Sequence, residues 1–316
     1  TIEGDYIGFG TANYNRTKTT IVDGGCITGV RNWGQLTSIN DYAFYQCTGL
    51  TSVTIPNSIT SIGYWAFEGC INLASVTIPN SITSIGGRAF YSCESLTEIT
   101  IPDSVTSINN YTFYECTGLT EIEVPNSVRT IGQGAFRNTN LTKITLPFVG
   151  ISRDATGSSA YFYYVFGYEA SYVPSTLKEV VITDATQIGD LAFASCRNIE
   201  KVTINEGITT LGSSAFSGCS NLKEINLPES LTSTGSSAFE YCTSLTGIEF
   251  LPDSVETIGD FAFYGCTGLE KVEFLPNSVE TIGEYAFYGC DFLDEIIIRS
   301  FNCSIYDSSE TIPTWT

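Results

Sequence analysis

The sequence predicts an α/β repeat solenoid, a fold in which short coils stack so that each buries the apolar face of the next. Residues 49–70 and 72–93 read GLTSVTIPNSITSIGYWAFEGC and NLASVTIPNSITSIGGRAFYSC, and this segment recurs mostly at a spacing of 23 residues. One copy is too short to fold alone. Ordering its residues costs roughly 1–2 kcal/mol each, which offsets burial of its few large apolar side chains at about 1.5–3 kcal/mol each.

One phenylalanine marks each of eleven units. These residues are Phe44, Phe67, Phe90, Phe113, Phe136, Phe166, Phe193, Phe216, Phe239, Phe263 and Phe287. Most steps between them are 23 residues, the last two are 24, and the step from Phe136 to Phe166 contains an insertion. We expect the eleven rings to pack on one another in a continuous core.

The first element of a unit is predicted to be a strand. In residues 50–55, LTSVTI, apolar side chains alternate with hydroxyl residues, which is typical of a strand with one buried face. Pro56 cannot donate a ladder hydrogen bond, so the strand should end there. Asn57 favours a turn, and Gly63 is expected to take a positive φ for a second bend.

The second element is predicted to be a single helical turn. Ala66 and Phe67 precede Cys70 by four and three residues, so one helical turn would direct all three side chains inward. Leu73 then begins the next strand.

The pattern Leu-x-x-Val-x-Ile-Pro-x-Ser-Ile-x-x-Ile-Gly-x-x-Ala-Phe-x-x-Cys resembles the 23-residue leucine-rich repeat of BspA-like surface proteins, over about residues 36–298. The resemblance implies a right-handed horseshoe with a parallel sheet on its concave face and short turns, strands or 3-10 segments on its convex face. It also implies a bacterial cell-surface or extracellular location. The motif defines the core and leaves outward positions variable, so it assigns no binding residue.

The extent of the repeat divides the chain into three predicted segments. Residues 1–35 lack the repeat and are expected to cap the solenoid of residues 36–298, while residues 299–316 form a C-terminal cap or the start of a linker. Because the chain begins at Thr1 rather than Met, we expect a processed protein or a fragment. The tail is expected to precede a further domain.

The insertion, residues 148–175, is rich in tyrosine. We interpret residues 165–167 as a variant of the Ala-Phe turn and residues 177–182 as the strand after it. The favoured interpretation is a compact loop that packs its own aromatic rings. The alternative is a platform that stacks on sugar rings or anchors a protein partner, with Tyr163 and Tyr164 as its candidate residues.

Nine cysteines occupy one repeat position. They are Cys47, Cys70, Cys93, Cys116, Cys196, Cys219, Cys242, Cys266 and Cys290, and Thr139 takes the place of a tenth. Equivalent side chains in parallel coils point the same way, which disfavours disulfides, and no Cys-x-x-Cys pair suggests zinc. We predict a row of buried free thiols. Cys26 and Cys303 lie outside the row, and their state is open.

Composition and motifs exclude several functions. A formal charge of −20 disfavours nucleic acids and anionic membranes as partners, and no apolar run is long enough to span a bilayer. The chain has no histidine, and neither a phosphate-binding loop nor a nucleophile elbow occurs in it. Glu121 and Glu123 share a strand but are expected to be solvated surface acids. We therefore expect no enzyme, metal site or cofactor.

The outward strand positions supply the candidate binding residues. They include Thr54, Thr77, Thr100, Glu121, Glu123, Thr145, Lys201 and Lys271. Such a face is suited to binding an extended protein through many weak contacts, or it is a solvated sheet whose threonines serve strand propensity. A second column, Tyr45, Tyr91, Tyr114, Tyr264 and Tyr288, follows the core phenylalanines and is predicted to stack as packing.

The function predicted is non-catalytic adhesion. The family resemblance implies host matrix proteins such as fibronectin or fibrinogen, or other surface proteins, as partners. The alternatives are a carbohydrate-binding module that uses the Tyr-rich insertion and a passive spacer in a larger surface protein.

Overall fold

The structure is a computed structural model that describes residues 36–247, 251–270, 275–293, 295–296, 303–305 and 314–315. The predicted N-terminal cap and most of the predicted C-terminal segment lie outside the described residues. The chain divides into two compact units. The first unit contains the described residues up to Thr145 together with Tyr164–Thr176, and the second contains Leu146–Tyr163 and the described residues from Leu177 onward.

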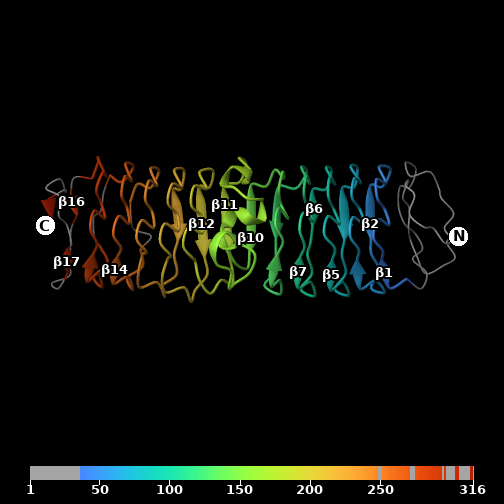
Figure 1. Cartoon of the computed structure of the whole chain (residues 1–316), viewed down its shortest axis with the longest axis horizontal. Coiled ribbons are helices and arrows are strands. Elements are labelled where there is room, and N and C mark those ends of the chain that lie inside the picture. The colour runs from blue at the N-terminus through green and yellow to red at the C-terminus, as the bar shows by residue number, and fades with distance from the viewer. Residues whose placement is uncertain are drawn as a thin grey trace. The chain divides into compact units, whose positions relative to one another are not determined.

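In the first unit each coil carries two short strands, and these form two rows (Figure 1). One row is β1 (Ser38–Ile39), β3 (Ser61–Ile62), β5 (Ser84–Ile85), β7 (Ser107–Ile108) and β9 (Thr130–Ile131), paired in that order. The other contains β2 (Ser52–Thr54), β4 (Ser75–Thr77) and β6 (Glu98–Ile99), followed by β8 (Glu121–Glu123), which pairs with β10 (Lys143–Leu146). The strand pairs within these rows are parallel and one repeat apart, as with Ser52 beside Ser75. Stacked coils are therefore confirmed.

The second unit repeats the parallel pairing. Its strands are β11 (Glu179–Ile182), β12 (Lys201–Ile204), β13 (Glu224–Asn226), β14 (Thr257–Ile258), β15 (Thr281–Ile282), β16 (Glu295–Ile296), β17 (Ser304–Ile305) and β18 (Thr314–Trp315). β11, β12 and β13 form one series, β14, β15 and β17 a second, and β16 pairs with β18. β11 confirms the strand predicted at residues 177–182.

The helical part of the predicted α/β class is wrong, because the described residues contain no α-helix. Only three 3-10 helices occur among them, η1 (Gly157–Ala160), η2 (Phe162–Val165) and η3 (Ala170–Tyr172), all within the insertion. At the Ala-Phe turn, Trp65 and Gly69 have φ of 55° and 73°, a left-handed conformation that ends any right-handed helix. The backbone N–H of Phe67 instead donates to Ala89 of the next coil, 2.8 Å away. The backbone of these turns thus forms a further ladder of hydrogen bonds between successive coils.

The predicted phenylalanine core is confirmed. All eleven phenylalanines are buried, and within each unit the rings of successive coils stack, except for Phe136 and Phe166, which are tilted. Phe67 and Phe90, for example, have ring centroids 5.3 Å apart and planes inclined by 3°. Because each ring covers the next, one coil supplies the core of its neighbour, and this explains why the segment repeats.

The insertion continues the phenylalanine row with two different residues. In the first unit, the N–H of Phe136 donates to Val165, and its ring lies 6.4 Å from that of Phe166, which confirms the predicted variant turn. In the second unit, Phe162 has the same relation to the following coil. Its N–H donates to Ala192 at 2.6 Å, and its ring stacks 4.9 Å from that of Phe193. The sequence did not indicate this role for Phe162.

The role predicted for Gly63 is also wrong. Gly63 has no positive φ, and its N–H donates to Ile39 of the preceding coil at 2.7 Å. A Cβ at this position would lie 2.5 Å from the backbone nitrogen of Asp41. Glycine is therefore required by the close approach of neighbouring backbones and not by an unusual torsion angle.

Candidate functional site

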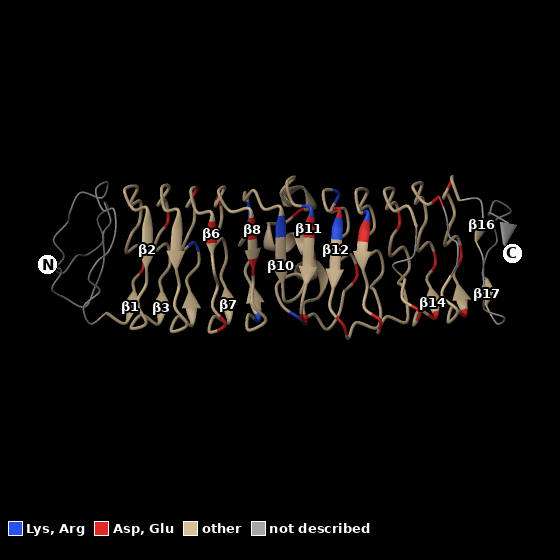
Figure 2. Cartoon of the chain, turned by 180° about the vertical axis from the view of Figure 1, so that it is seen from behind, with Lys and Arg blue, Asp and Glu red and all other residues tan. Residues whose placement is uncertain are grey.

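The strand face of the first unit is the surface formed by the outward side chains of β2, β4, β6, β8 and β10, and Figure 2 shows the ribbon of these strands. Among the predicted binding residues, Thr54, Thr77, Thr100, Glu121 and Glu123 are exposed, and Thr145 is half-buried. The parallel register places Thr54 beside Thr77 and Thr145 beside Glu123. These residues share the face because the alternate residues, such as Val53, are buried in the core.

This face contains a cavity where its sheet is interrupted. β6 ends one sheet and β8 begins another, so the strand ladder is broken between these two coils. A cavity of about 360 Å³ lies there, and its lining includes Asn80, Thr100, Pro102, Asp103, Glu123 and Pro125. Thr100 and Glu123 were predicted and are brought together. Asp103 was missed, although the sequence shows an acid there where the preceding coils have Asn57 and Asn80.

The strand face of the second unit alternates in charge along β11, β12 and β13 (Figure 2). Glu179, Lys201 and Glu224 are adjacent in the parallel register. The Nζ of Lys201 lies 3.0 Å from a carboxylate oxygen of Glu224, and this hydrogen bond raises the pKa of the lysine. The predicted binding residue Lys201 is therefore already paired within the chain, and Lys271 lies outside the described residues.

A second charge group lies beside β12. The carboxylate of Glu200 binds Lys223 at 2.8 Å and Lys178 at 3.3 Å, and these hydrogen bonds lower the pKa of Glu200. All three side chains are well solvated, so the pairs contribute little to stability.

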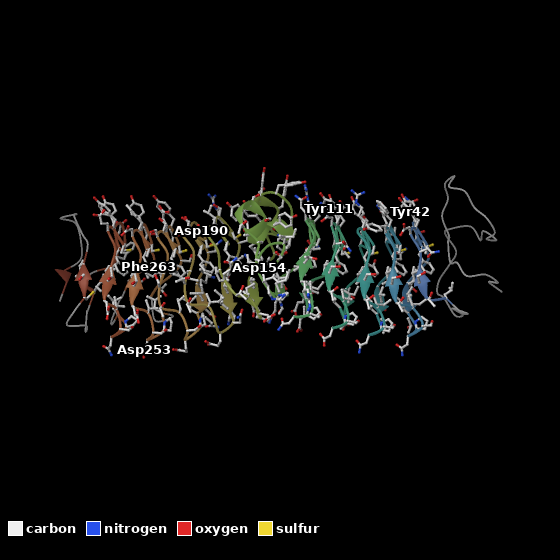
Figure 3. All side chains as sticks on the ribbon, turned by 60° about the horizontal axis from the view of Figure 1, so that its bottom comes forward. Tyr42, Tyr111, Asp154, Asp190, Asp253 and Phe263 are labelled. Atoms are coloured by element: carbon white, nitrogen blue, oxygen red, sulfur yellow. The ribbon has the colours of Figure 1, made fainter. Side chains whose placement is uncertain are left out.

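The turn face is formed by outward side chains of the Ala-Phe turns. In the first unit it carries an N-terminal aromatic cluster of Tyr42, Trp65, Tyr91, Tyr111 and Tyr114, of which Figure 3 labels Tyr42 and Tyr111 along one edge of the coils. Tyr91 and Tyr114 stack 4.5 Å apart, as predicted for this column. The guanidinium of Arg88 lies 5.9, 5.7 and 5.4 Å from the rings of Trp65, Tyr91 and Tyr111. This cluster thus contains its own cation.

Most aromatic rings of the insertion are buried or half-buried, largely against the neighbouring coils. Phe162 and Phe166 are buried, and the guanidinium of Arg137 lies 3.9 Å from the ring centroid of Tyr172. Burial and the nearby Tyr168 raise the pKa of Tyr164. Tyr168 itself is 67% exposed. The rings of the insertion are thus mostly covered by the coils of their own unit and not by one another, and Tyr168 is left in solvent.

The cysteine row is free and buried, as predicted. Burial raises the pKa of Cys47 to about 11 and that of Cys219 to about 12, so these thiols are poor nucleophiles near neutral pH. Cys303 is also free and is half-buried, whereas Cys26 lies outside the described residues.

Two further properties concern only the part of the chain that the structure describes. No group of three or more cysteine or carboxylate side chains there is placed to hold a metal ion. In the same residues, no helix has the length and apolar content needed to cross a bilayer.

Comparison with known families gives a match over most of the chain. The family described as BspA type leucine rich repeat region matches in six copies, over residues 37–161 and 186–309. No curated protein sequence matches the chain.

Solved structures of bacterial leucine-rich repeat proteins are similar to this chain. One from Bacteroides ovatus is 24% identical, with 94% of this chain and 98% of that chain covered and a TM-score of 0.45. A leucine rich cell surface protein from Faecalibacterium prausnitzii is 27% identical, with coverage of 90% and 89% and a TM-score of 0.38. A leucine rich repeat protein of T. pallidum is 26% identical, with coverage of 63% and 79% and a TM-score of 0.40.

Proposed function

Because the chain belongs to the family of BspA-type leucine-rich repeat proteins, we propose that it is a non-catalytic interaction protein of the bacterial cell surface or the extracellular space. Its proposed partners are other surface proteins, among them host matrix proteins such as fibronectin or fibrinogen. The proposed binding surface is the strand face of the first unit.

The cavity between β6 and β8 is the observation that supports this surface. The face around it carries exposed hydroxyl and carboxylate groups at fixed spacing, which suits many weak contacts with an extended partner. At the cavity the ladder is broken, and Thr100, Asp103 and Glu123 surround a hollow large enough for one partner side chain. Two carboxylates in this lining favour a lysine or arginine there.

The experiment measures binding of the protein to immobilised fibronectin and fibrinogen at low and high salt. The variant Thr100→Arg/Glu123→Lys fills the cavity and reverses its charge, so we expect binding to weaken by about tenfold or more. Thr54→Arg is the control for the arginine of this pair and is compared directly with the single variant Thr100→Arg, since both add one arginine at equivalent outward positions and the sheet is continuous at Thr54. The affinity of Thr54→Arg should be unchanged.

Equal loss in both variants would show that the cavity has no special role. Binding to neither matrix protein would contradict adhesion to these partners and would favour the passive spacer. Binding that is insensitive to salt would contradict the role given to the carboxylates.

The carbohydrate-binding alternative rests on the insertion. Tyr163 and Tyr164 are half-buried, and Tyr168 adds a solvent-exposed ring. Retention on polysaccharide columns, lost in Tyr163→Ala, Tyr164→Ala or Tyr168→Ala, would favour this alternative. Single substitutions are required because deleting the insertion would remove the buried Phe162 and Phe166.

A further inference from the structure

The turn face of the second unit carries a C-terminal aromatic cluster, which consists of Tyr241, Phe261, Tyr264, Tyr285 and Tyr288. Phe261 stacks on Tyr285 at 5.2 Å, and Tyr264 stacks on Tyr288 at 5.4 Å. Tyr241 meets Tyr264 edge-on at 5.5 Å. Tyr241, Tyr288 and Phe261 remain 49%, 37% and 36% exposed, so this cluster presents aromatic surface to solvent.

The N-terminal aromatic cluster shows what such rings bind in this same fold. There, Arg88 occupies the turn position two residues before the core phenylalanine and contacts three rings. In the second unit that position is taken by Phe261 in one coil and Tyr285 in the next. The guanidinium of Arg137 lies 5.9 Å from the ring of Tyr114 in that cluster. Its position, directly after the core phenylalanine, is likewise taken by Tyr264 and Tyr288. The coils of the C-terminal cluster thus repeat the rings that Trp65 and Tyr111 supply in the first unit, but no coil there supplies an arginine at the position of Arg88 or Arg137.

The charge around the C-terminal aromatic cluster favours a cation from elsewhere. Residues 224–295 contain fourteen acidic residues and a single basic one, Lys271, which lies outside the described residues. Glu240, Asp260 and Glu284 each directly precede a ring of the cluster. Asp260 and Glu284 are exposed, and among the residues drawn in Figure 2 the coils near β14 show red without blue. A positively charged partner would be attracted here, and an acidic one repelled.

We propose that the C-terminal aromatic cluster is a docking surface for an arginine-rich segment of a partner protein, whose guanidinium groups lie on the exposed rings and pair with the flanking carboxylates. Arginine fits better than lysine, because its planar guanidinium stacks on aromatic rings and also binds carboxylates in a bidentate manner. This surface and the strand face of the first unit share no residue, so the inference does not rest on the proposed function.

The test uses a fluorescent peptide of alternating arginine and glycine and measures its binding to the full chain by anisotropy. The control peptide carries citrulline, which is nearly isosteric with arginine but uncharged. We expect the arginine peptide to bind at least about tenfold more tightly, with an affinity that falls as salt is raised.

Two variants locate the site on the rings. Phe261→Ser and Tyr288→Ser introduce the residue that other coils carry at the same turn positions, namely Ser214 and Ser217. Ser214 has φ of 54° and Phe261 has φ of 56°, so the backbone accepts serine there without a change of conformation. Each variant should weaken binding of the arginine peptide by about fivefold or more. Tyr91→Ser, in the cluster that already holds Arg88, should leave it unchanged.

Glu284→Gln tests the carboxylates without altering the rings, and it should also weaken binding, most clearly at low salt. The proposal would be overturned if the citrulline peptide bound as tightly as the arginine peptide. It would equally be overturned if Phe261→Ser and Tyr288→Ser, shown to be folded by circular dichroism, kept the affinity of the unmodified chain. In that case the acidic charge alone would account for binding.

Discussion

The thiol of Cys93 donates a hydrogen bond to the carbonyl oxygen of Phe67, 3.2 Å away in the preceding coil. The same oxygen accepts the N–H of Cys70 at 3.1 Å, so it binds groups of two successive coils. The relation recurs for Cys70, Cys116, Cys219, Cys242, Cys266 and Cys290. The cysteine row thus joins coils through hydrogen bonds as well as filling the core.

Replacing one cysteine should distinguish these two contributions. At Thr139, the residue that takes the place of a cysteine, Oγ1 donates to the carbonyl of Phe136 in its own coil at 2.8 Å, so a hydroxyl at this position is satisfied without a bond to the preceding coil. We expect Cys93→Thr to change the free energy of unfolding by less than about 1 kcal/mol. Cys93→Ala loses both the bond and the volume, and should cost about 1–2 kcal/mol. Urea denaturation measures both, and equal values for the two variants would show that the lost bond to the preceding coil, and not the lost volume, sets the cost.

Thiol labelling of the native protein should divide the cysteines into two classes. Because the pKa of Cys47 is raised to about 11, only about one thousandth of this side chain is thiolate at pH 8. The other cysteines of the row are also buried. We expect Cys303, which is half-buried, to react with iodoacetamide before any of them, as followed by mass spectrometry of peptides. Fast labelling of Cys93 or Cys116 would mean that the core opens readily.

Alkaline pH should destabilise the fold through the same thiols. Burial keeps Cys219 neutral up to about pH 12, whereas in the unfolded chain it ionises near pH 9. Below pH 9 both states hold the proton, so stability is unaffected. Above it the unfolded state loses the proton first, and the free energy of unfolding falls by about 1.4 kcal/mol per pH unit for each such thiol.

The variant Cys219→Thr isolates this effect. It removes one titrating thiol and leaves the tyrosines and lysines in place, so its stability should decline less steeply between pH 9 and pH 11 than that of the unmodified chain. Parallel curves for the two proteins would show that Cys219 does not contribute to the alkaline loss. Urea denaturation at each pH provides the measurement.

The features set by periodicity could be read from the sequence. The spacing of Phe44, Phe67 and their equivalents predicted stacked coils, and the Val-x-Ile alternation predicted one row of strands. The fixed position of the cysteines predicted their burial. Each of these three features depends only on which residues recur. In a stacked array, an apolar residue that recurs at one repeat position must contact the equivalent residue of the next coil.

The features set by backbone conformation could not be read. A helical spacing of Ala66, Phe67 and Cys70 is equally compatible with the observed turn, whose left-handed residue is Trp65 in one coil and Arg88 in the next. Trp65 and Arg88 are not residue types that indicate a positive φ in a sequence. Their conformation is imposed by hydrogen bonds to neighbouring coils. The break between β6 and β8 likewise depends on pairing between coils. Thr100 and Glu123 were therefore predicted as surface residues and not as the lining of one cavity.

A pair of glycine substitutions should measure how closely the coils approach. A Cβ at Gly86 would lie 2.5 Å from the carbonyl carbon of Gly63 and 2.6 Å from its oxygen, and neither backbone atom can rotate away. Gly189 occupies the same place in its own coil, but a Cβ there would meet nothing within 4 Å. Neither glycine has a positive φ, so alanine is conformationally acceptable at both positions.

We expect Gly86→Ala to lower the free energy of unfolding by about 3 kcal/mol or more, because the two coils must separate to admit the methyl group. Gly189→Ala should be neutral or should stabilise by up to about 1 kcal/mol, because it restricts only the unfolded chain. Urea denaturation of both variants gives the comparison. A similarly small effect of both substitutions would mean that neighbouring coils are not held at backbone contact. The two positions are compared because an added methyl group meets backbone atoms at Gly86 and meets nothing at Gly189.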